Sequence, residues 1–120
     1  RMIVKDGTGN RADALGYRVG GKTGSAEKPG VGGYSRNLVV STFASAFPMD
    51  NPRYVVLAML DEPQGTEASS FQRTAGYTAA PVVRKTITRI GPLMGIIPDM
   101  KRDVDVSELM PLLWKAKGEQ

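Results

Sequence analysis

The chain has 120 residues, 41% of them hydrophobic, which suits one domain or a piece of a larger one. It contains neither cysteine nor histidine, which excludes disulfides, thiolate or histidine metal sites and a Ser-His-Asp triad. Its 16 Lys and Arg against 12 Asp and Glu give a net charge of +4, too small and too scattered to indicate a nucleic acid partner. Because the sequence begins at Arg1 and not at a start methionine, we expect a piece of a longer protein.

The first half of the chain predicts three strands. Residues 17–23 can be extended, and residues 38–47 are rich in β-branched and aromatic side chains. Residues 53–60 are apolar on both sides, which favours a strand covered on both faces. The stretch from 24 to 37 holds a proline and several glycines and predicts a loop, whereas the two prolines within 48–52 mark a hairpin turn.

The second half predicts one helix after a polar loop over residues 63–74. One face of this helix carries apolar side chains three and four positions apart: Ala80, Val83, Ile87 and Ile90. Pro81 suits the first turn, where no intrahelical bond is lost, and Gly91 with Pro92 should end the helix. The basic residues late in the helix suit the negative end of its dipole.

Beyond residue 98 the pattern weakens. Residues 107–117 predict a short helix interrupted by Pro111, with Trp114 available for a groove. The longest apolar run, residues 54–60, is too short to span a bilayer, and the sequence shows no signal-peptide pattern.

Residues 16–23 match G-x-x-x-x-G-K-[ST], the pattern of a phosphate-binding P-loop. A P-loop needs a buried strand before the first glycine and a helix that starts at its Lys-Thr, because the helix N-terminus holds the phosphates. Residues 10–15 do not form a buried strand pattern, and Pro29 with its neighbouring glycines prevents a useful helix after Thr23. The context therefore argues against a nucleotide site.

Lys22-Thr23-Gly24 is also a motif of penicillin-binding proteins and related β-lactamases. The tripeptide alone is a weak signal, but its surroundings resemble class B penicillin-binding proteins over roughly residues 1–99. Within that class they look most like the septal, cell-division peptidoglycan D,D-transpeptidases. The resemblance is carried by GYRVGGKTGSAEK at 16–28, NPRYVVLAMLDEP at 51–63 and GYTAAPVV at 76–83, with shorter matches at 7–9 and 95–99.

The resemblance implies an α+β fold, in which an antiparallel sheet with three of the family's five strands carries a C-terminal helix packed on it. Residues 1–99 would be the C-terminal part of a transpeptidase (penicillin-binding) domain, and residues 100–120 a C-terminal tail. In the family the S-x-x-K and S-x-N elements precede Lys-Thr-Gly at a distance. We therefore expect the nucleophile to lie outside this chain, the complete protein to be a serine-type D,D-transpeptidase, and this piece alone to be inactive.

Two local matches to those upstream elements are interpreted as coincidences. Ser25-Ala26-Glu27-Lys28 fits S-x-x-K, and Ser35-Arg36-Asn37 fits S-x-N. In the family the nucleophile starts a buried helix, which holds serine and lysine on adjacent turns so that the amine can take the hydroxyl proton. Pro29 and Gly30 follow Lys28 at once, so a helix cannot hold this pair. Asp61 and Glu62 are interpreted as structural charges at a strand end.

By resemblance, Lys22 and Ser25 are the catalytic contributors of this chain, and Lys22, Thr23, Gly24 and Ser25 bind substrate. Lys22 would supply positive charge, Thr23 and Ser25 would offer hydroxyls to the terminal carboxylate, and Gly24 would leave room for the peptide. The Ser25 N–H would be half of the oxyanion hole. The family usually has threonine where Ser25 stands, a change that keeps the hydroxyl. The resemblance implies no cofactor and no metal.

The implied partners are peptidoglycan stem peptides, β-lactams and division-machinery proteins, and the implied location is the periplasmic side of the bacterial inner membrane, with the anchor outside this chain. Since the family's sheet continues beyond residues 53–60, we expect that strand to have a bare edge and the chain to self-associate through it or through the helix. Two alternatives stay open: a non-catalytic module that captures a carboxylate and, with less support, a P-loop nucleotide binder.

Overall fold

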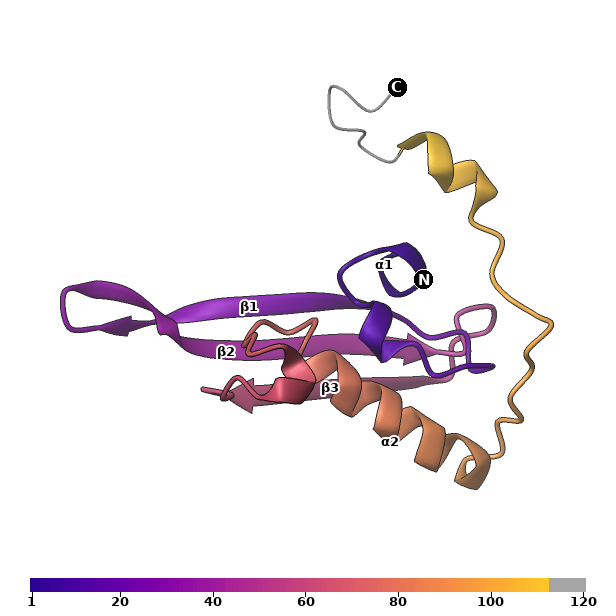
Figure 1. Ribbon diagram of the computed structural model, residues 1–120. Helices are drawn as coiled ribbons and strands as arrows, with labels where there is room; N and C mark the ends of the chain where they lie inside the picture. Colours follow the sequence, from indigo (N-terminus) through magenta and orange to yellow (C-terminus); the bar gives the residue numbers. More distant parts are fainter. Residues whose placement is uncertain (113–120) are drawn as a thin grey trace.

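A three-stranded antiparallel sheet with one long helix on one face forms the body of the molecule (Figure 1). A computed structural model describes residues 1–112, apart from the side chain of Arg36. The strands are β1 (Gly20–Gly30), β2 (Gly33–Phe47) and β3 (Tyr54–Asp61), in the order β1-β2-β3. The helix is α2 (Ala79–Leu93), so the predicted α+β class, the three strands and the helix are confirmed.

Short helical segments surround this body. The N-terminal segment holds α1 (Met2–Asp6) and the 3₁₀ turn η1 (Asn10–Ala12), both before β1. Two further 3₁₀ turns, η2 (Glu67–Ser69) and η3 (Ser107–Leu112), precede and follow α2. Within residues 1–112, no helix is both long enough and apolar enough to cross a membrane.

The loop expected at residues 24–37 is instead a long hairpin arm, which corrects that prediction. β1 continues to Gly30 and β2 begins at Gly33, with Gly30 paired to Gly33 across the turn. Gly32 and Gly33 adopt φ of +85° and +126°, a backbone region that disfavours side chains, so the glycines are turn residues of a hairpin. Pro29 is tolerated because β1 is an edge strand.

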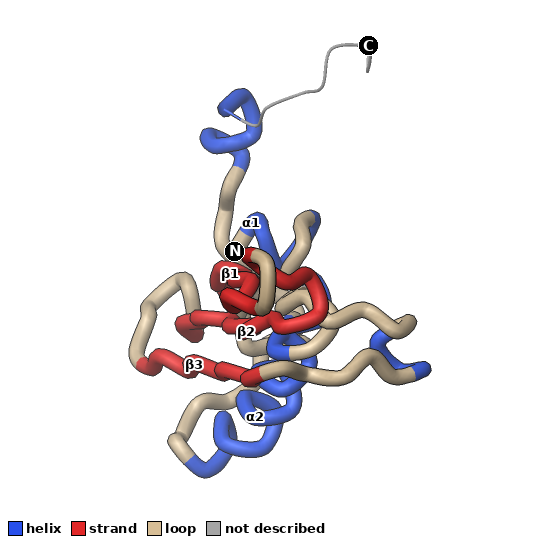
Figure 2. Tube along the Cα trace, turned by 90° about the vertical axis from the view of Figure 1, so that its left-hand side faces the viewer, coloured by secondary structure: helices blue, strands red, loops and turns tan. Residues whose placement is uncertain are grey.

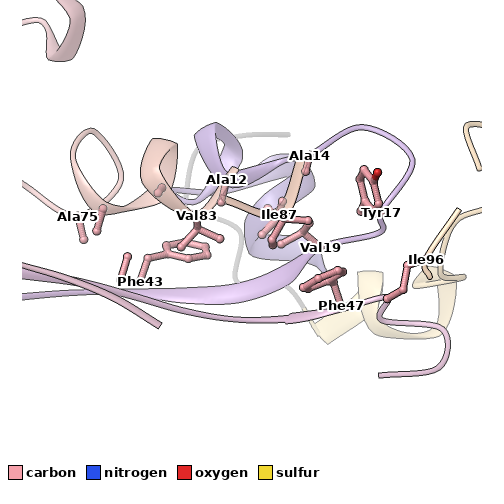
Figure 3. Packing of buried hydrophobic residues seen from close by; sticks show 14 residues of the cluster. Ala12, Ala14, Tyr17, Val19, Phe43, Phe47, Ala75, Val83, Ile87 and Ile96 are labelled. Atoms are coloured by element: carbon pink, nitrogen blue, oxygen red, sulfur yellow. The ribbon is translucent and has the colours of Figure 1, made fainter. Parts of the chain in front are cut away.

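The core lies between the sheet and α2 (Figure 3). Phe43 and Phe47 of β2 are fully buried against Val83 and Ile87 of α2, and each such ring contributes about 1.5–3 kcal/mol through burial. Tyr17 meets the Phe47 ring edge-on, with ring centroids 6.2 Å apart. Two positions on this side of β2 are serines rather than apolar residues, and both hydroxyls are hydrogen-bonded: Ser41 to Thr78 and Ser45 to the Val56 carbonyl.

The end of α2 differs from the prediction. The helix passes through Pro92 and ends at Leu93, and its last turn holds no basic residue. Pro92 has no N–H to donate to the Thr88 carbonyl, so one helical hydrogen bond is missing, but the Met94 N–H still reaches the Ile90 carbonyl at 2.9 Å. Gly91 is needed for packing rather than for stopping the helix, because a Cβ there would strike the Tyr17 ring.

The opposite face of the sheet is open. Val55, Leu57 and Met59 of β3 are 77%, 60% and 62% exposed, whereas Ala58, which faces α2, is buried. The expectation that this strand is covered on both faces is therefore wrong for this chain. In Figures 1 and 2, α2 runs along one side of the sheet, which accounts for the difference between alternate residues.

The segment after α2 returns along the body and is held there by a backbone hydrogen bond and by ion pairs. The Asp99 N–H donates to the Gly16 carbonyl at 2.9 Å, Arg102 pairs with Asp50 at 2.7 Å, and Asp103 pairs with Arg1 at 2.8 Å. The hydrogen bond from Arg1 holds the pKa of Asp103 below its usual range. η3 then stands away from the sheet (Figure 1) and includes Pro111, as expected, whereas the rest of the predicted helix, with Trp114, lies outside the described residues.

Candidate functional site

The Lys-Thr-Gly triplet lies in the edge strand β1 and not at the start of a helix, so the context required for a P-loop is absent there. Thr23 and Ser25 pair with Phe43 and Ser41 of β2, the two positions that face α2. Because successive side chains of a strand alternate between faces, Lys22 and Gly24 belong to the opposite side. The strand therefore divides the four predicted site residues into two pairs.

Thr23 and Ser25 line a cavity of about 660 Å³, here called the hydroxyl pocket. Its other walls are the turn around Thr8, the 3₁₀ turn η1 and residues 74–77, which lead into α2. At its rim the Arg11 guanidinium lies 4.2 Å from the centre of the Tyr77 ring. Asp6 supplies a carboxylate on the same lining, so the pocket combines hydroxyls with charges of both signs.

The Thr23 hydroxyl is already engaged by a second threonine. Thr8 Oγ1 and Thr23 Oγ1 are 3.2 Å apart, and either oxygen can be the donor. A Cβ at Gly9 would lie 2.8 Å from the Phe43 ring, and one at Gly76 would strike the Thr8 carbonyl. Gly9 and Gly76 therefore let this turn approach β2 and the segment before α2 closely. The sequence pattern indicated residues 7–9 as a match but gave no role to Thr8.

The Ser25 hydroxyl is anchored by the backbone. The Ala75 N–H donates to Ser25 Oγ at 2.9 Å. A backbone amide can only donate, so Ser25 acts as the acceptor and its own proton remains available for another group. Residue 75 was not a candidate from the sequence, because a backbone contact across 50 residues leaves no signal in the side-chain pattern.

Lys22 lies apart from the hydroxyl pocket. It is exposed, its Nζ donates to the neighbouring Thr23 carbonyl at 2.9 Å, and it lines a separate depression of about 270 Å³ with Ala44 and Met49. Gly24 has a local reason to be glycine, since a Cβ there would lie 2.6 Å from Thr42 Oγ1 of the adjacent strand. The structure therefore brings together Thr23 and Ser25 and does not bring Lys22 to them.

The two pattern matches interpreted as coincidences show no catalytic geometry. Ser25 and Lys28 both lie in β1, where no helical turn joins them. The Lys28 ammonium instead donates to Glu62 at 2.8 Å and Asp61 at 3.0 Å, which raises the pKa of Lys28. These ion pairs agree with a structural role for the two acids at the end of β3. Ser35 Oγ accepts a hydrogen bond from the Asn37 N–H at 3.3 Å, a local turn contact.

A metal-ligating cluster of three acidic or thiol side chains does not occur within residues 1–112. The polar side chains that line the hydroxyl pocket are instead hydroxyls, the Asn10 amide, the Arg11 guanidinium and the Asp6 carboxylate. Hydroxyl and guanidinium protons are donors, so the part of the pocket formed by Thr23, Ser25 and Arg11 suits a ligand that presents a carboxylate.

Comparison with known proteins identifies the family. Residues 1–88 match the family model "Penicillin binding protein transpeptidase domain", and the chain belongs to this family. It is 45% identical over 96 residues to the probable peptidoglycan D,D-transpeptidase FtsI of Caulobacter vibrioides, covering 75% of this chain and 16% of the relative. It is 38% identical over 96 residues to stage V sporulation protein D of Bacillus subtilis, covering 80% of this chain and 14% of the relative. The chain thus spans about a sixth of the length of these relatives.

Solved structures with the same fold are also similar in sequence. The transpeptidase domain of Burkholderia pseudomallei penicillin-binding protein 3 superposes with a TM-score of 0.67 at 31% identity, over 82% of this chain and 28% of that domain. Mycobacterium tuberculosis penicillin-binding protein 3 in complex with ampicillin gives a TM-score of 0.66 at 30% identity, over 82% of this chain and 21% of its own. The sheet and helix described above are therefore part of a penicillin-binding transpeptidase fold.

Proposed function

We propose that the complete protein is a septal peptidoglycan D,D-transpeptidase and that residues 1–99 are the C-terminal part of its catalytic domain. A serine outside this chain attacks the carbonyl of the D-Ala-D-Ala bond, the terminal D-Ala leaves, and an acyl-enzyme ester forms. An amine of a neighbouring stem peptide then displaces the serine and forms the cross-link. Two relatives support this assignment by name, the Caulobacter protein and the FtsI homolog of Mesostigma viride.

One observation carries the proposal: Thr23 and Ser25 present two hydroxyls on one face of an edge strand, beside an open pocket. Ser25 Oγ already accepts from the Ala75 N–H, so its proton can be donated to the terminal carboxylate of a stem peptide. Lys22 adds positive charge from the other side of β1. The Ser25 N–H is our candidate for one oxyanion donor, a contribution worth about 3 to 4 kcal/mol where such donors have been removed.

The same proposal includes the ligands and location that the family suggests. Penicillin-binding protein 3 of Mycobacterium tuberculosis has been solved with ampicillin and with aztreonam, and we propose that the complete form of this protein binds β-lactams as well. We place it on the periplasmic side of the bacterial inner membrane, in contact with division-machinery proteins. We also propose that the 120-residue chain by itself self-associates, through β3 or through α2.

Acylation by a fluorescent penicillin tests the function in the complete protein. Thr23→Val keeps the shape of the side chain and removes the hydroxyl, so acylation should slow by about tenfold to a hundredfold, the range for a hydrogen bond to a charged group. Thr88→Val is a matched control, because the Thr88 hydroxyl bonds only the Arg84 carbonyl of its own helix among the described residues.

The 120-residue chain alone should not be labelled. Labelling at Ser25 would show that Ser25 and Lys28 form a nucleophile pair after all. Equal acylation of Thr23→Val and the unaltered protein would remove Thr23 from the site. Reversible binding of a carboxylate ligand to the complete protein, without acylation, would favour the non-catalytic binding module instead.

A further inference from the structure

The contact between Thr8 and Thr23 has a chemical consequence for the proposed substrate site. A hydroxyl has one proton to donate, and a carboxylate can only accept. If Thr23 donates its proton to a carboxylate, Thr23 must be the acceptor in its hydrogen bond with Thr8. The Thr8 O–H then donates to Thr23 Oγ1, and the Thr23 O–H points into the hydroxyl pocket.

We propose that Thr8 is a positioning residue, which orients the Thr23 hydroxyl as a donor toward the terminal carboxylate of the substrate. This inference rests on the proposed function, since it concerns the same site. The two oxygens are 3.2 Å apart, within hydrogen-bonding distance, and both side chains line the pocket. Donation by Thr8 also polarises the Thr23 hydroxyl, because consecutive hydrogen bonds strengthen one another.

The turn that carries Thr8 is held closely enough for this role. The Gly9 N–H donates to the Ile3 carbonyl at 3.0 Å, and the Asn10 N–H donates to the Gly7 carbonyl at 3.3 Å. Gly9 packs against the Phe43 ring, and the Thr8 carbonyl lies against Gly76. Backbone contacts on both sides of Thr8 thus fix its Cα, while its side chain remains exposed toward the pocket.

Ser25 shows the same arrangement with a different donor. Its oxygen accepts from the Ala75 N–H at 2.9 Å, which leaves the Ser25 proton available. The two hydroxyls lie two residues apart on one face of β1, and each has a neighbour able to occupy its acceptor side. Thr8 therefore does for Thr23 what a backbone amide does for Ser25.

The test uses the complete protein and two readouts. The first is the rate of acylation by a fluorescent penicillin, and the second is the equilibrium binding of N-acetyl-D-Ala-D-Ala, which needs no turnover. Thr8→Val should reduce both by about threefold to tenfold, the size expected for one neutral hydrogen bond. Thr8→Ser, which keeps the hydroxyl, should restore both.

A double variant separates positioning from a general structural effect. If Thr8 acts through Thr23, Thr8→Val added to Thr23→Val should cause no further loss, whereas an independent effect on folding would multiply the two losses. The inference would be overturned if the losses of acylation rate and affinity in the double variant were the product of the two single losses. It would also be overturned if Thr8→Val bound the dipeptide as tightly as the unaltered protein. An unaltered protein that binds the dipeptide but is never acylated would contradict the proposed function, and Thr8 would then be judged by binding alone.

Discussion

The two faces of the sheet contain similarly apolar residues in opposite environments. On the face toward α2, Phe43 and Phe47 are fully buried and Ala58 is 9% exposed. On the other face, Leu57 and Met59 are 60% and 62% exposed, although they alternate with Ala58 along the same strand. An apolar pattern in a strand therefore indicates which side chains favour burial, but it does not indicate which segment or partner chain buries them. This chain covers one face by itself.

The largest expected effect lies on the covered face. Phe43→Ala should lower the free energy of unfolding by about 3–5 kcal/mol, because it leaves a cavity between β2 and α2 and removes the ring against which Gly9 packs. Leu57→Ala is the matched change on the open face, and it should stay within about 0.5 kcal/mol, as surface substitutions do. Urea denaturation of the 120-residue chain measures both values, at a protein concentration low enough that light scattering shows a monomer.

Equal losses for the two variants would contradict the comparison. They would mean that Leu57 is as well covered in solution as Phe43, for example by a second copy of the chain. The dependence of the midpoint on protein concentration distinguishes this case, since only an association makes stability depend on concentration.

The second prediction, with a smaller expected effect, concerns self-association through the open face and the unpaired edge of β3. The chain should self-associate, and Leu57→Lys should weaken that association because it places a charge on the exposed apolar surface. Val31→Lys is the control, since Val31 is fully exposed in the turn between β1 and β2 and belongs to neither β3 nor α2. Light scattering over a concentration series gives the result. A chain that stays monomeric throughout would show that the exposed face needs no partner.

The sequence predicted the elements better than their boundaries and surroundings. The three strands followed from extended, β-branched and apolar stretches, the helix followed from the spacing of its apolar residues, and all four were confirmed. The hairpin arm was missed because glycine and proline mark both a loop and the tip of a long hairpin, and only the pairing of Gly30 with Gly33 distinguishes them. Gly91 was interpreted as a helix stop. Its packing against Tyr17 joins residues far apart in the sequence, so the local pattern did not reveal it.

The candidate site was predictable only in part for the same reason. The residues from Lys22 to Ser25 were identified through resemblance to a family, and the alternation of a strand then separates Lys22 from the two hydroxyls. Thr8 and Ala75 lie 15 and 50 residues from the groups they contact. Their contacts depend on how the turn and the start of α2 fold over β1, which no local pattern encodes.

We propose that Thr23 and Ser25 hold the carboxylate of the substrate through their hydroxyls. A crystal structure of the complete protein acylated by ampicillin tests it most directly, because the drug carries a carboxylate in the corresponding position. We expect carboxylate oxygens about 2.5–3.0 Å from both Thr23 Oγ1 and Ser25 Oγ, the usual length of an O–H···O bond. The proposal would be contradicted if other groups, such as Arg11, held the carboxylate while the two hydroxyls contacted only Thr8 and the Ala75 N–H.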